Sequence, residues 1–284
     1  MSTPSIDDLT HVVDALREWQ SDTAPFQLHP GDVGWAWRFG DEAMAAGLRT
    51  WSRDGRMLAV GMLDGPTLLR LTVAPDAHCY EGLAQRVADD VIDPARGVLP
   101  EGRVNVEAPP GALVNDLLSD AGWKADQPWT PLQRDLRAPV EDPQVRIEVV
   151  GAALADEWAA VVRTSFDGST FSAERWHAIA AAPPYADARS LLARDERGNA
   201  VAAIGTWSAG AGRPGLIEPM GVHPEHRGHG YGRAITLAAA AALRELGSSS
   251  AIVCTPSSNI AGVATYASAG FQRLPERQDR YRDG

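Results

Sequence analysis

The second half of the chain alternates between strand-like and helix-like patterns of hydrophobic residues. Residues 145–150 alternate apolar and polar positions, which is typical of a half-buried strand. Residues 152–166 instead place Trp158, Val161 and Val162 on one helical face. The remaining pattern predicts, in order, a helix at 170–181, a hairpin of 190–194 and 200–208, a strand at 215–222, a helix at 232–246, a strand at 251–255, a helix at 260–269 and a final strand from 270.

The first half repeats this order more faintly. It predicts strands at 34–39, 47–52, 57–62, 67–73, 103–107 and 130–136, and helices at 80–91 and 113–121. Between the halves, residues 137–143 (R-A-P-V-E-D-P) are polar, contain two prolines and lack periodicity, as a linker does. We therefore predict two α/β domains, residues 1–138 and 144–284, each a mixed sheet with helices on both faces.

The composition narrows the class of protein without identifying it. Hydrophobic residues make up 44% and charged residues 22% of the 284, as in ordinary globular proteins. The net charge of -11 argues against a nucleic-acid partner, whose phosphates require a basic surface. No stretch is long and apolar enough to span a membrane, and the acidic N-terminus lacks the apolar core of a signal peptide, so we expect a cytoplasmic location and no membrane partner.

A glycine-rich turn is the clearest candidate for chemistry. Residues 222–232 read V-H-P-E-H-R-G-H-G-Y-G and lie between a predicted strand and a predicted helix. Glycines allow the backbone to approach a ligand closely, and a helix N-terminus attracts phosphate. The Gly-Lys-Ser/Thr of a Walker A loop is absent, because Gly232-Arg233-Ala234 stands there, and the spacing G-x-G-x-G differs from the G-x-G-x-x-G of dinucleotide-binding turns.

The pattern V-x-P-x-x-R-G-x-G-x-G resembles the central motif of the GNAT acetyltransferase superfamily. Downstream, N-x-x-G-x-x-x-Y-x-x-x-G-F from Asn259 to Phe271 resembles a second motif of that family. The resemblance implies that acetyl-CoA lies where the strands at 215–222 and 251–255 splay apart, with no metal. The residues that it assigns to acetyl-CoA binding are Met220, Gly221, Val222, Arg227, Gly228, His229, Gly230, Tyr231, Gly232, Arg233 and Asn259.

The same resemblance suggests the acid and the base of an acetyl transfer. Tyr266 matches the position of the general acid in many members, although a tyrosine that only packs on the CoA tail is the alternative. Glu218 lies on the strand that often carries the base, and period-two alternation puts it on the same face as Met220 and Val222. A bulge at Pro219 would upset that count, and an ion pair with an arginine is the alternative role for Glu218.

Other reactive side chains carry weaker signals. His223, His226 and His229 fall across the turn rather than on a helix, so we expect no metal site there. Two cysteines are too few for a disulfide framework, and Cys254 has no evident histidine or aspartate partner. We therefore expect direct attack by the acceptor rather than a covalent enzyme intermediate.

The first half resembles a degenerate copy of the second. Residues 76–83 read D-A-H-C-Y-E-G-L, which lacks the arginine and all but one glycine of the turn. The arrangement is similar to that of tandem family members with one active half. We therefore predict an N-acetyltransferase acting on a primary amine of a small molecule, as a monomer or homodimer. The alternatives are acetylation of a cysteine–sugar amine, as by a mycothiol synthase, and a non-catalytic CoA sensor.

Overall fold

The computed structural model describes residues 1–283, and within them twelve strands form one mixed sheet. The spatial order is β1-β2-β3-β4-β12-β5-β10-β9-β8-β7-β6, with β11 paired to β5 outside this path. The strands are β1 (Leu48–Arg53), β2 (Arg56–Leu63), β3 (Leu68–Val73), β4 (Val104–Glu107), β5 (Lys124–Asp135), β6 (Arg146–Val149), β7 (Ala188–Arg194), β8 (Ala200–Ser208), β9 (Gly215–Val222), β10 (Ser250–Pro256), β11 (Gln272–Arg273) and β12 (Arg277–Arg282).

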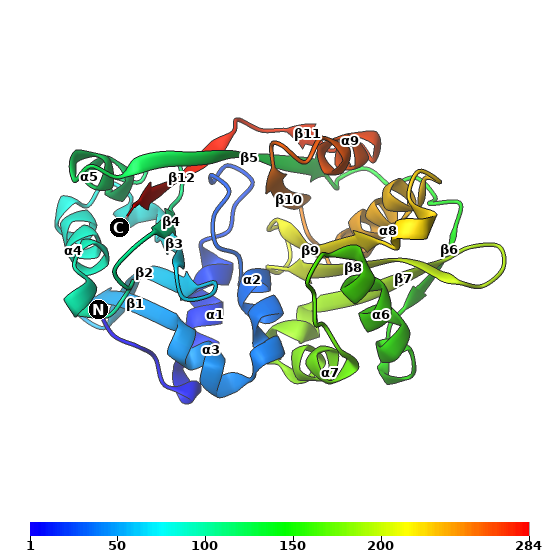
Figure 1. Ribbon diagram of the computed structural model, residues 1–284, viewed down its shortest axis with the longest axis horizontal. Helices are drawn as coiled ribbons and strands as arrows, with labels where there is room; N and C mark the ends of the chain where they lie inside the picture. The colour runs from blue at the N-terminus through cyan, green and yellow to red at the C-terminus, as the bar shows by residue number, and fades with distance from the viewer. Residues whose placement is uncertain (284) are drawn as a thin grey trace.

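Helices cover this sheet in two lobes, which confirms the predicted mixed α/β class (Figure 1). They are α1 (Leu9–Glu18), α2 (Pro30–Ala36), α3 (Asp41–Gly47), α4 (Glu81–Ile92), α5 (Val114–Asp120), α6 (Ala155–Ser165), α7 (Ala173–Ala181), α8 (Tyr231–Glu245) and α9 (Ile260–Ser268). Leucine, valine and tryptophan side chains form a buried core in each lobe. Helix α2 lies between the lobes and packs on β8 and β9 (Figure 1).

The strand predicted at 34–39 is wrong, because these residues belong to α2 and to a 3-10 turn at Trp37–Phe39. The chain is set up as a helix just upstream, where Pro30 occupies the first turn and the Nδ1 atom of His29 accepts from the Gly31 N–H at 2.9 Å. Gly34 packs so tightly that a Cβ there would lie 2.3 Å from Cζ3 of Trp207. Helix α2 is therefore specified by its N-terminal cap and by a contact distant in sequence. Neither feature can be recognised from the spacing of hydrophobic residues.

Two strands join the lobes. Strand β5 pairs with β10 along its second half and with β12 along its first half, so it runs through both lobes (Figure 1). Strand β12, at the C-terminal end of the chain, also pairs with β4 in the lobe built from the first half. The domain boundary at 138–144 stays a prediction, but the sheet itself continues across it.

A chain of buried charges reinforces this junction. Glu107 on β4 accepts a hydrogen bond from Nε of Arg70 at 2.9 Å and one from Nη1 of Arg277 at 2.7 Å. Arg70 also forms an ion pair with Asp32 of α2 at 2.8 Å, and Arg277 forms one with Asp279 of β12. Each of these side chains is at most 12% exposed. Helix α2 and strands β3, β4 and β12 are thus tied by charge-assisted contacts that solvent cannot replace.

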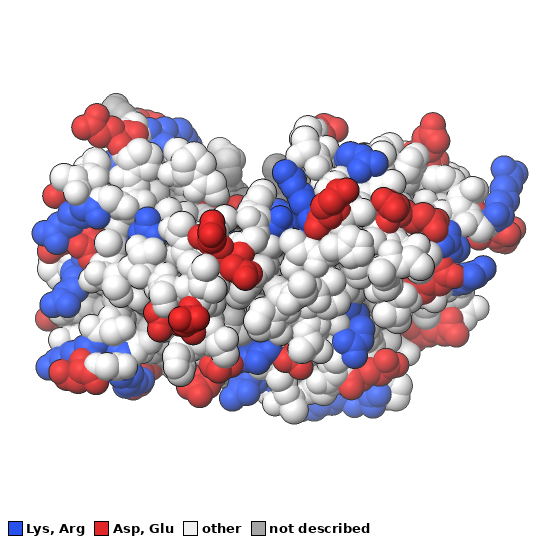
Figure 2. Space-filling view, turned by 90° about the horizontal axis from the view of Figure 1, so that it is seen from below, with Lys and Arg blue, Asp and Glu red and all other residues white. Residues whose placement is uncertain are grey.

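The surface is mixed in charge. On the face shown in Figure 2, lysine and arginine side chains lie among aspartate and glutamate rather than gathering in one patch. No helix among residues 1–283 has both the length and the apolar character needed to cross a bilayer.

The buried position of Glu107 leads to a test of stability. Burial acts to raise its pKa, but Arg70 and Arg277 outweigh that effect and lower the pKa to about 2. The ionised carboxylate therefore stabilises the fold above pH ~4.5, and this contribution is lost as the pH falls toward 2. We expect Glu107→Gln to lower the free energy of unfolding by about 3–5 kcal/mol at pH 7, because two buried guanidinium groups each lose one of their two carboxylate partners.

Urea denaturation of the wild type and the variant at several pH values would measure this difference. Glu101→Gln is the control, since Glu101 is exposed. The expected difference between Glu107→Gln and wild type shrinks as the pH falls from 4.5 toward 2. A difference of the same size at all these pH values would contradict the conclusion that the folded state lowers the pKa of Glu107.

Candidate active site

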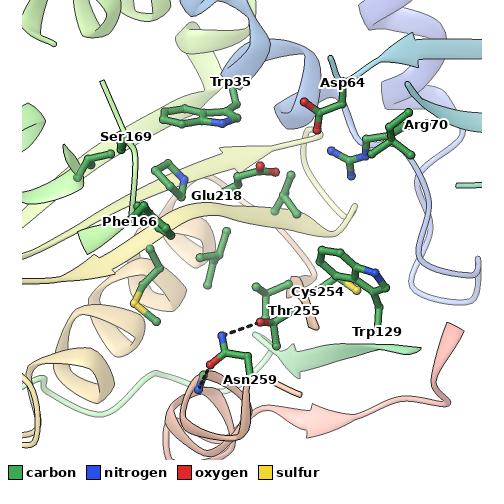
Figure 3. Close-up of a pocket in the computed structure, with 18 of the residues that line it drawn as sticks. Trp35, Asp64, Arg70, Trp129, Phe166, Ser169, Glu218, Cys254, Thr255 and Asn259 are labelled. Atoms are coloured by element: carbon green, nitrogen blue, oxygen red, sulfur yellow. Dashed lines mark hydrogen bonds between the residues drawn. The ribbon is translucent and has the colours of Figure 1, made fainter. Parts of the chain in front are cut away.

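Strands β9 and β10 separate soon after they begin to pair. Their parallel pairing consists of Gly215 with Ala251 and Leu216 with Ile252. Beyond these residues a cavity of about 600 Å³ lies between the strands and receives side chains from both lobes (Figure 3). The splayed strands that the sequence motif implied are therefore present.

A bulge shapes the β9 side of this cavity. The register between β8 and β9 shifts between Ile204 and Thr206, opposite Glu218 and Pro219, as the proline in this strand suggested. Gly205 is required here, because a Cβ would lie 2.4 Å from the carbonyl oxygen of Glu218. The same carbonyl accepts a hydrogen bond from Nε1 of Trp207 at 2.7 Å. The backbone at the bulge is thus fixed, and the Glu218 side chain lines the cavity.

The edge of β9 that faces β10 has free backbone groups. The N–H of His223 donates to the carbonyl of Val201 at 2.9 Å, which fixes the alternation of hydrogen-bonded pairs between β8 and β9. By that alternation, Met220 and Val222 direct their N–H and C=O groups away from β8, toward the gap. An extended ligand could pair there as an additional strand.

The turn before α8 has the geometry of an anion site. Gly228 and Gly230 have φ of +81° and +83°, which only glycine adopts without strain. Across the described chain, the six backbone N–H groups of residues 228–233 donate to no other residue. Six unpaired donors at the N-terminus of a 15-residue helix favour phosphate oxygens strongly.

The arginines of the turn brace it. Arg227 donates from Nη2 to the carbonyl of Ser165 at 3.0 Å, and from Nε to that of Val222 at 3.3 Å. Arg233 donates from Nε to the carbonyl of Ser268 at 2.9 Å. Each guanidinium keeps further N–H groups for a ligand. Around the turn, as elsewhere in residues 1–283, no group of side chains is arranged to hold a metal ion.

Glu218 lies in an acidic part of the cavity. Burial raises its pKa well above the ordinary value, and Asp32 and Asp64 act in the same direction while Arg70 opposes them. In Figure 3, Glu218, Asp64, Arg70 and Trp35 lie at one end of the pocket, away from Thr255 and Asn259. The sequence motifs gave no signal for Asp32 and Asp64, because both come from the first half of the chain.

The second motif lines the opposite wall. The Oδ1 atom of Asn259 accepts from the Gly262 N–H, and its Nδ2 donates to Oγ1 of Thr255, both at 3.0 Å, so Asn259 caps α9. Tyr266, about two turns further along α9, is 6% exposed and also lines the cavity. Its pKa is raised, mainly by burial, so the phenol stays protonated at neutral pH. Burial also raises the pKa of Cys254 to about 12, which keeps its thiol protonated.

The equivalent gap in the first half is nearly closed. A cavity of about 10 Å³ lies there, lined by apolar residues such as Leu71, Val87 and Val114, and it has room for about one water molecule. Beside it, the N–H groups of Tyr80 and Leu83 are already bonded to backbone carbonyls. The first half therefore lacks the volume of the second, and its turn has fewer free donors.

Comparison with known proteins agrees with this geometry. Residues 153–271 match the family model described as acetyltransferase (GNAT) family. This match covers most of the C-terminal half of the chain, including the glycine-rich turn and the segment from Asn259 to Phe271. Mycothiol acetyltransferase of Thermobispora bispora is 44% identical over 59 residues, which are 21% of this chain and 20% of that protein. The chain thus aligns with about a fifth of the length of this curated relative.

Two solved structures share the GNAT fold over nearly the whole chain. The GCN5-related N-acetyltransferase of Sphaerobacter thermophilus has a TM-score of 0.61 at 18% identity, covering 99% of this chain and 94% of its own. A tandem GNAT protein from the clavulanic acid biosynthesis pathway has a TM-score of 0.62 at 17% identity, covering 99% and 97%. Because these similarities extend through the first half, the tandem arrangement of the fold is confirmed.

The proposed anion site at the glycine turn before α8 can be tested by substitution. We expect Gly230→Asp to weaken acetyl-CoA binding at least ~100-fold, because a carboxylate would stand among donors suited to phosphate and the backbone would be strained. Isothermal titration calorimetry with acetyl-CoA measures the loss. Gly198→Asp is the matched control, since Gly198 has φ +86° in the open turn between β7 and β8. Equal affinity of both variants would refute the assignment of the turn.

Proposed function

We propose that this protein transfers the acetyl group of acetyl-CoA to a primary amine of a small molecule. The observation that carries the proposal is the gap between β9 and β10, which joins the free edge of β9 to the cavity beneath Glu218. Pantetheine pairs with Met220 and Val222, and the pyrophosphate is bound by the N–H groups of residues 228–233. The acceptor enters from the side of Trp35 and Glu218.

The residues of the cavity supply the two proton transfers that aminolysis of a thioester requires. The amine nitrogen forms a bond to the acetyl carbon while the carbon–sulfur bond breaks. Glu218 accepts a proton from the amine nitrogen, directly or through one water molecule, and Tyr266 donates its phenolic O–H to the departing sulfur. A carboxylate with a raised pKa is a stronger base than an ordinary one. The thiol of Cys254 stays protonated, which favours direct attack over an acetylated enzyme.

A single acetyl-CoA site per chain is part of the proposal. The nearly closed gap and the bonded N–H groups of Tyr80 and Leu83 support it. In this view the first half serves the reaction by forming a wall of the acceptor side of the cavity, through residues such as Trp35, Asp64 and Arg70.

A second candidate function is acetylation of a cysteine–sugar amine. It is favoured by the 44% identity over 59 residues to a protein named mycothiol acetyltransferase. Transfer to glucosamine-linked cysteine far exceeding transfer to simpler amines would support this narrower acceptor. We retain the broader proposal because the identical segment covers only 21% of this chain.

The role of Tyr266 predicts a separation of binding from turnover. We expect Tyr266→Phe to lower kcat about 10²–10⁴-fold, because the sulfur loses its proton donor, while the Kd for acetyl-CoA stays unchanged. Thiol release followed with a chromogenic disulfide gives kcat, and calorimetry gives Kd. Tyr80→Phe is the control, since Tyr80 lies on the surface of the first half. Undiminished turnover in Tyr266→Phe would exclude Tyr266 as the general acid and would indicate that it only packs in the cavity.

The role of Glu218 predicts a change in the pH profile. Because Glu218 must be ionised to accept a proton, kcat/KM of the wild type should rise with pH through a pKa well above 4.5. Glu218→Gln should lower kcat/KM about 10²–10⁴-fold and remove this acidic limb. Measurement of kcat/KM between pH 5 and 9 tests this. An acidic limb that persists in the variant would assign the base to another group.

A further inference from the structure

Two arginines from different halves of the chain meet on one aromatic ring at the acceptor side of the cavity. Arg38 follows α2, Arg175 lies on α7, and both line the cavity. The guanidinium carbon of Arg38 lies 4.4 Å from the ring centroid of Phe39, and that of Arg175 lies 5.4 Å from the same centroid. Both guanidinium groups thus lie over the same ring, near enough for the charge of Arg175 to lower the pKa of Arg38.

Neither guanidinium has a carboxylate partner within residues 1–283. The other two arginines of the cavity, Arg70 and Arg277, each form two ion pairs. Arg38 instead stacks on Trp35, with 4.6 Å between its guanidinium carbon and the ring centroid. Asp64 and Glu218 lie near enough to act on the pKa of Arg38, which burial lowers, but neither forms an ion pair with it.

The two side chains are positioned and still have free donors. Arg38 donates from Nη1 to the carbonyl of Trp35 at 2.8 Å. Arg175 donates from Nη1 to Oγ1 of Thr170 at 3.1 Å. A guanidinium has five N–H groups, so several on each side chain stay available. Two like charges that line one partly desolvated pocket repel each other, and an anion that contacts both would relieve the repulsion through charge-assisted hydrogen bonds.

We propose that the acceptor is a primary amine that also carries an anionic group, a carboxylate or a phosphate, which Arg38 and Arg175 bind. This inference rests on the proposed function. Glu218 faces the same cavity (Figure 3) and receives the amine. The cavity therefore offers opposite charges to the two ends of one zwitterionic molecule. Residues 223–233 of the phosphate-binding turn are not among those that line this cavity. The arginine pair is therefore a second anion site, separate from the one proposed for the CoA pyrophosphate.

Matched amines that differ only in the anionic group provide the test. The pairs are propylamine with 3-aminopropanoate, ethanolamine with phosphoethanolamine, and glucosamine with glucosamine 6-phosphate. We expect kcat/KM to be about tenfold or more higher for the anionic member of at least one pair. The ratio should fall toward one in the double variant Arg38→Gln, Arg175→Gln. Arg197→Gln, in the exposed turn between β7 and β8, is the control and should leave the ratio unchanged.

The outcomes separate this inference from the proposed function. A preference for a carboxylate pair or for a phosphate pair identifies the kind of anion, and either supports the inference. Equal transfer to both members of every pair overturns it and leaves the acetyltransferase proposal intact. A raised KM for acetyl-CoA in the double variant, with an unchanged ratio, also overturns it, because the arginines would then bind a CoA phosphate.

If no amine of any pair is acetylated, the proposed function fails and the arginine site is judged by binding alone. Calorimetry would then measure 3-aminopropanoate and phosphoethanolamine with the CoA-bound protein. Binding that is lost in the double variant but kept in Arg197→Gln supports an anion site. The same binding in all three proteins, or none in the wild type, overturns it.

Discussion

The structure depends on one constraint, that β9 and β10 must separate without either strand losing its order. Each strand keeps a partner on its outer edge. Strand β9 pairs with β8, and β10 pairs with β5 over all seven of its residues. Strand β5 comes from the first half of the chain and continues into the other lobe. The gap is therefore held open by a sheet that both halves build together, and its free backbone groups remain available to a ligand.

The sequence predicted those parts of the structure that depend on residues close together in the chain. The glycine turn, the start of α8 and the cap of α9 at Asn259 all depend on residues within a few positions of one another, and the structure has these elements where the motifs indicated them. Pro219 likewise predicted the bulge in β9, because a proline cannot complete the ladder. The proposed roles of Tyr266 and Glu218 go one step beyond the fold and stay predictions.

Features that depend on distant pairing were missed. The sequence pattern of residues 277–282 does not predict that they pair with β4, since many strands have the same alternation of side chains. The strand expected at 34–39 was wrong for a related reason, since the fit of α2 against Trp207 is specified across more than 170 residues. The residues that the first half places near Glu218 were also not predicted. Asp32, Arg38 and Arg70 belong to no motif, and they become neighbours of Glu218 only when the lobes pack.

The first half helps to build the cavity of the second half, although its own gap is nearly closed. Without β5, strand β10 would be an exposed edge beside the gap, and exposed edges invite wrong pairing. Without α2 and β3, Glu218 would lose Asp32 and Arg70, the two charged neighbours that most affect its pKa. The wall that contains Arg38 would also be absent, which would open the cavity to water and weaken every charge interaction inside it. The packing residues of the first half therefore matter to the cavity even though that half has no complete glycine turn of its own.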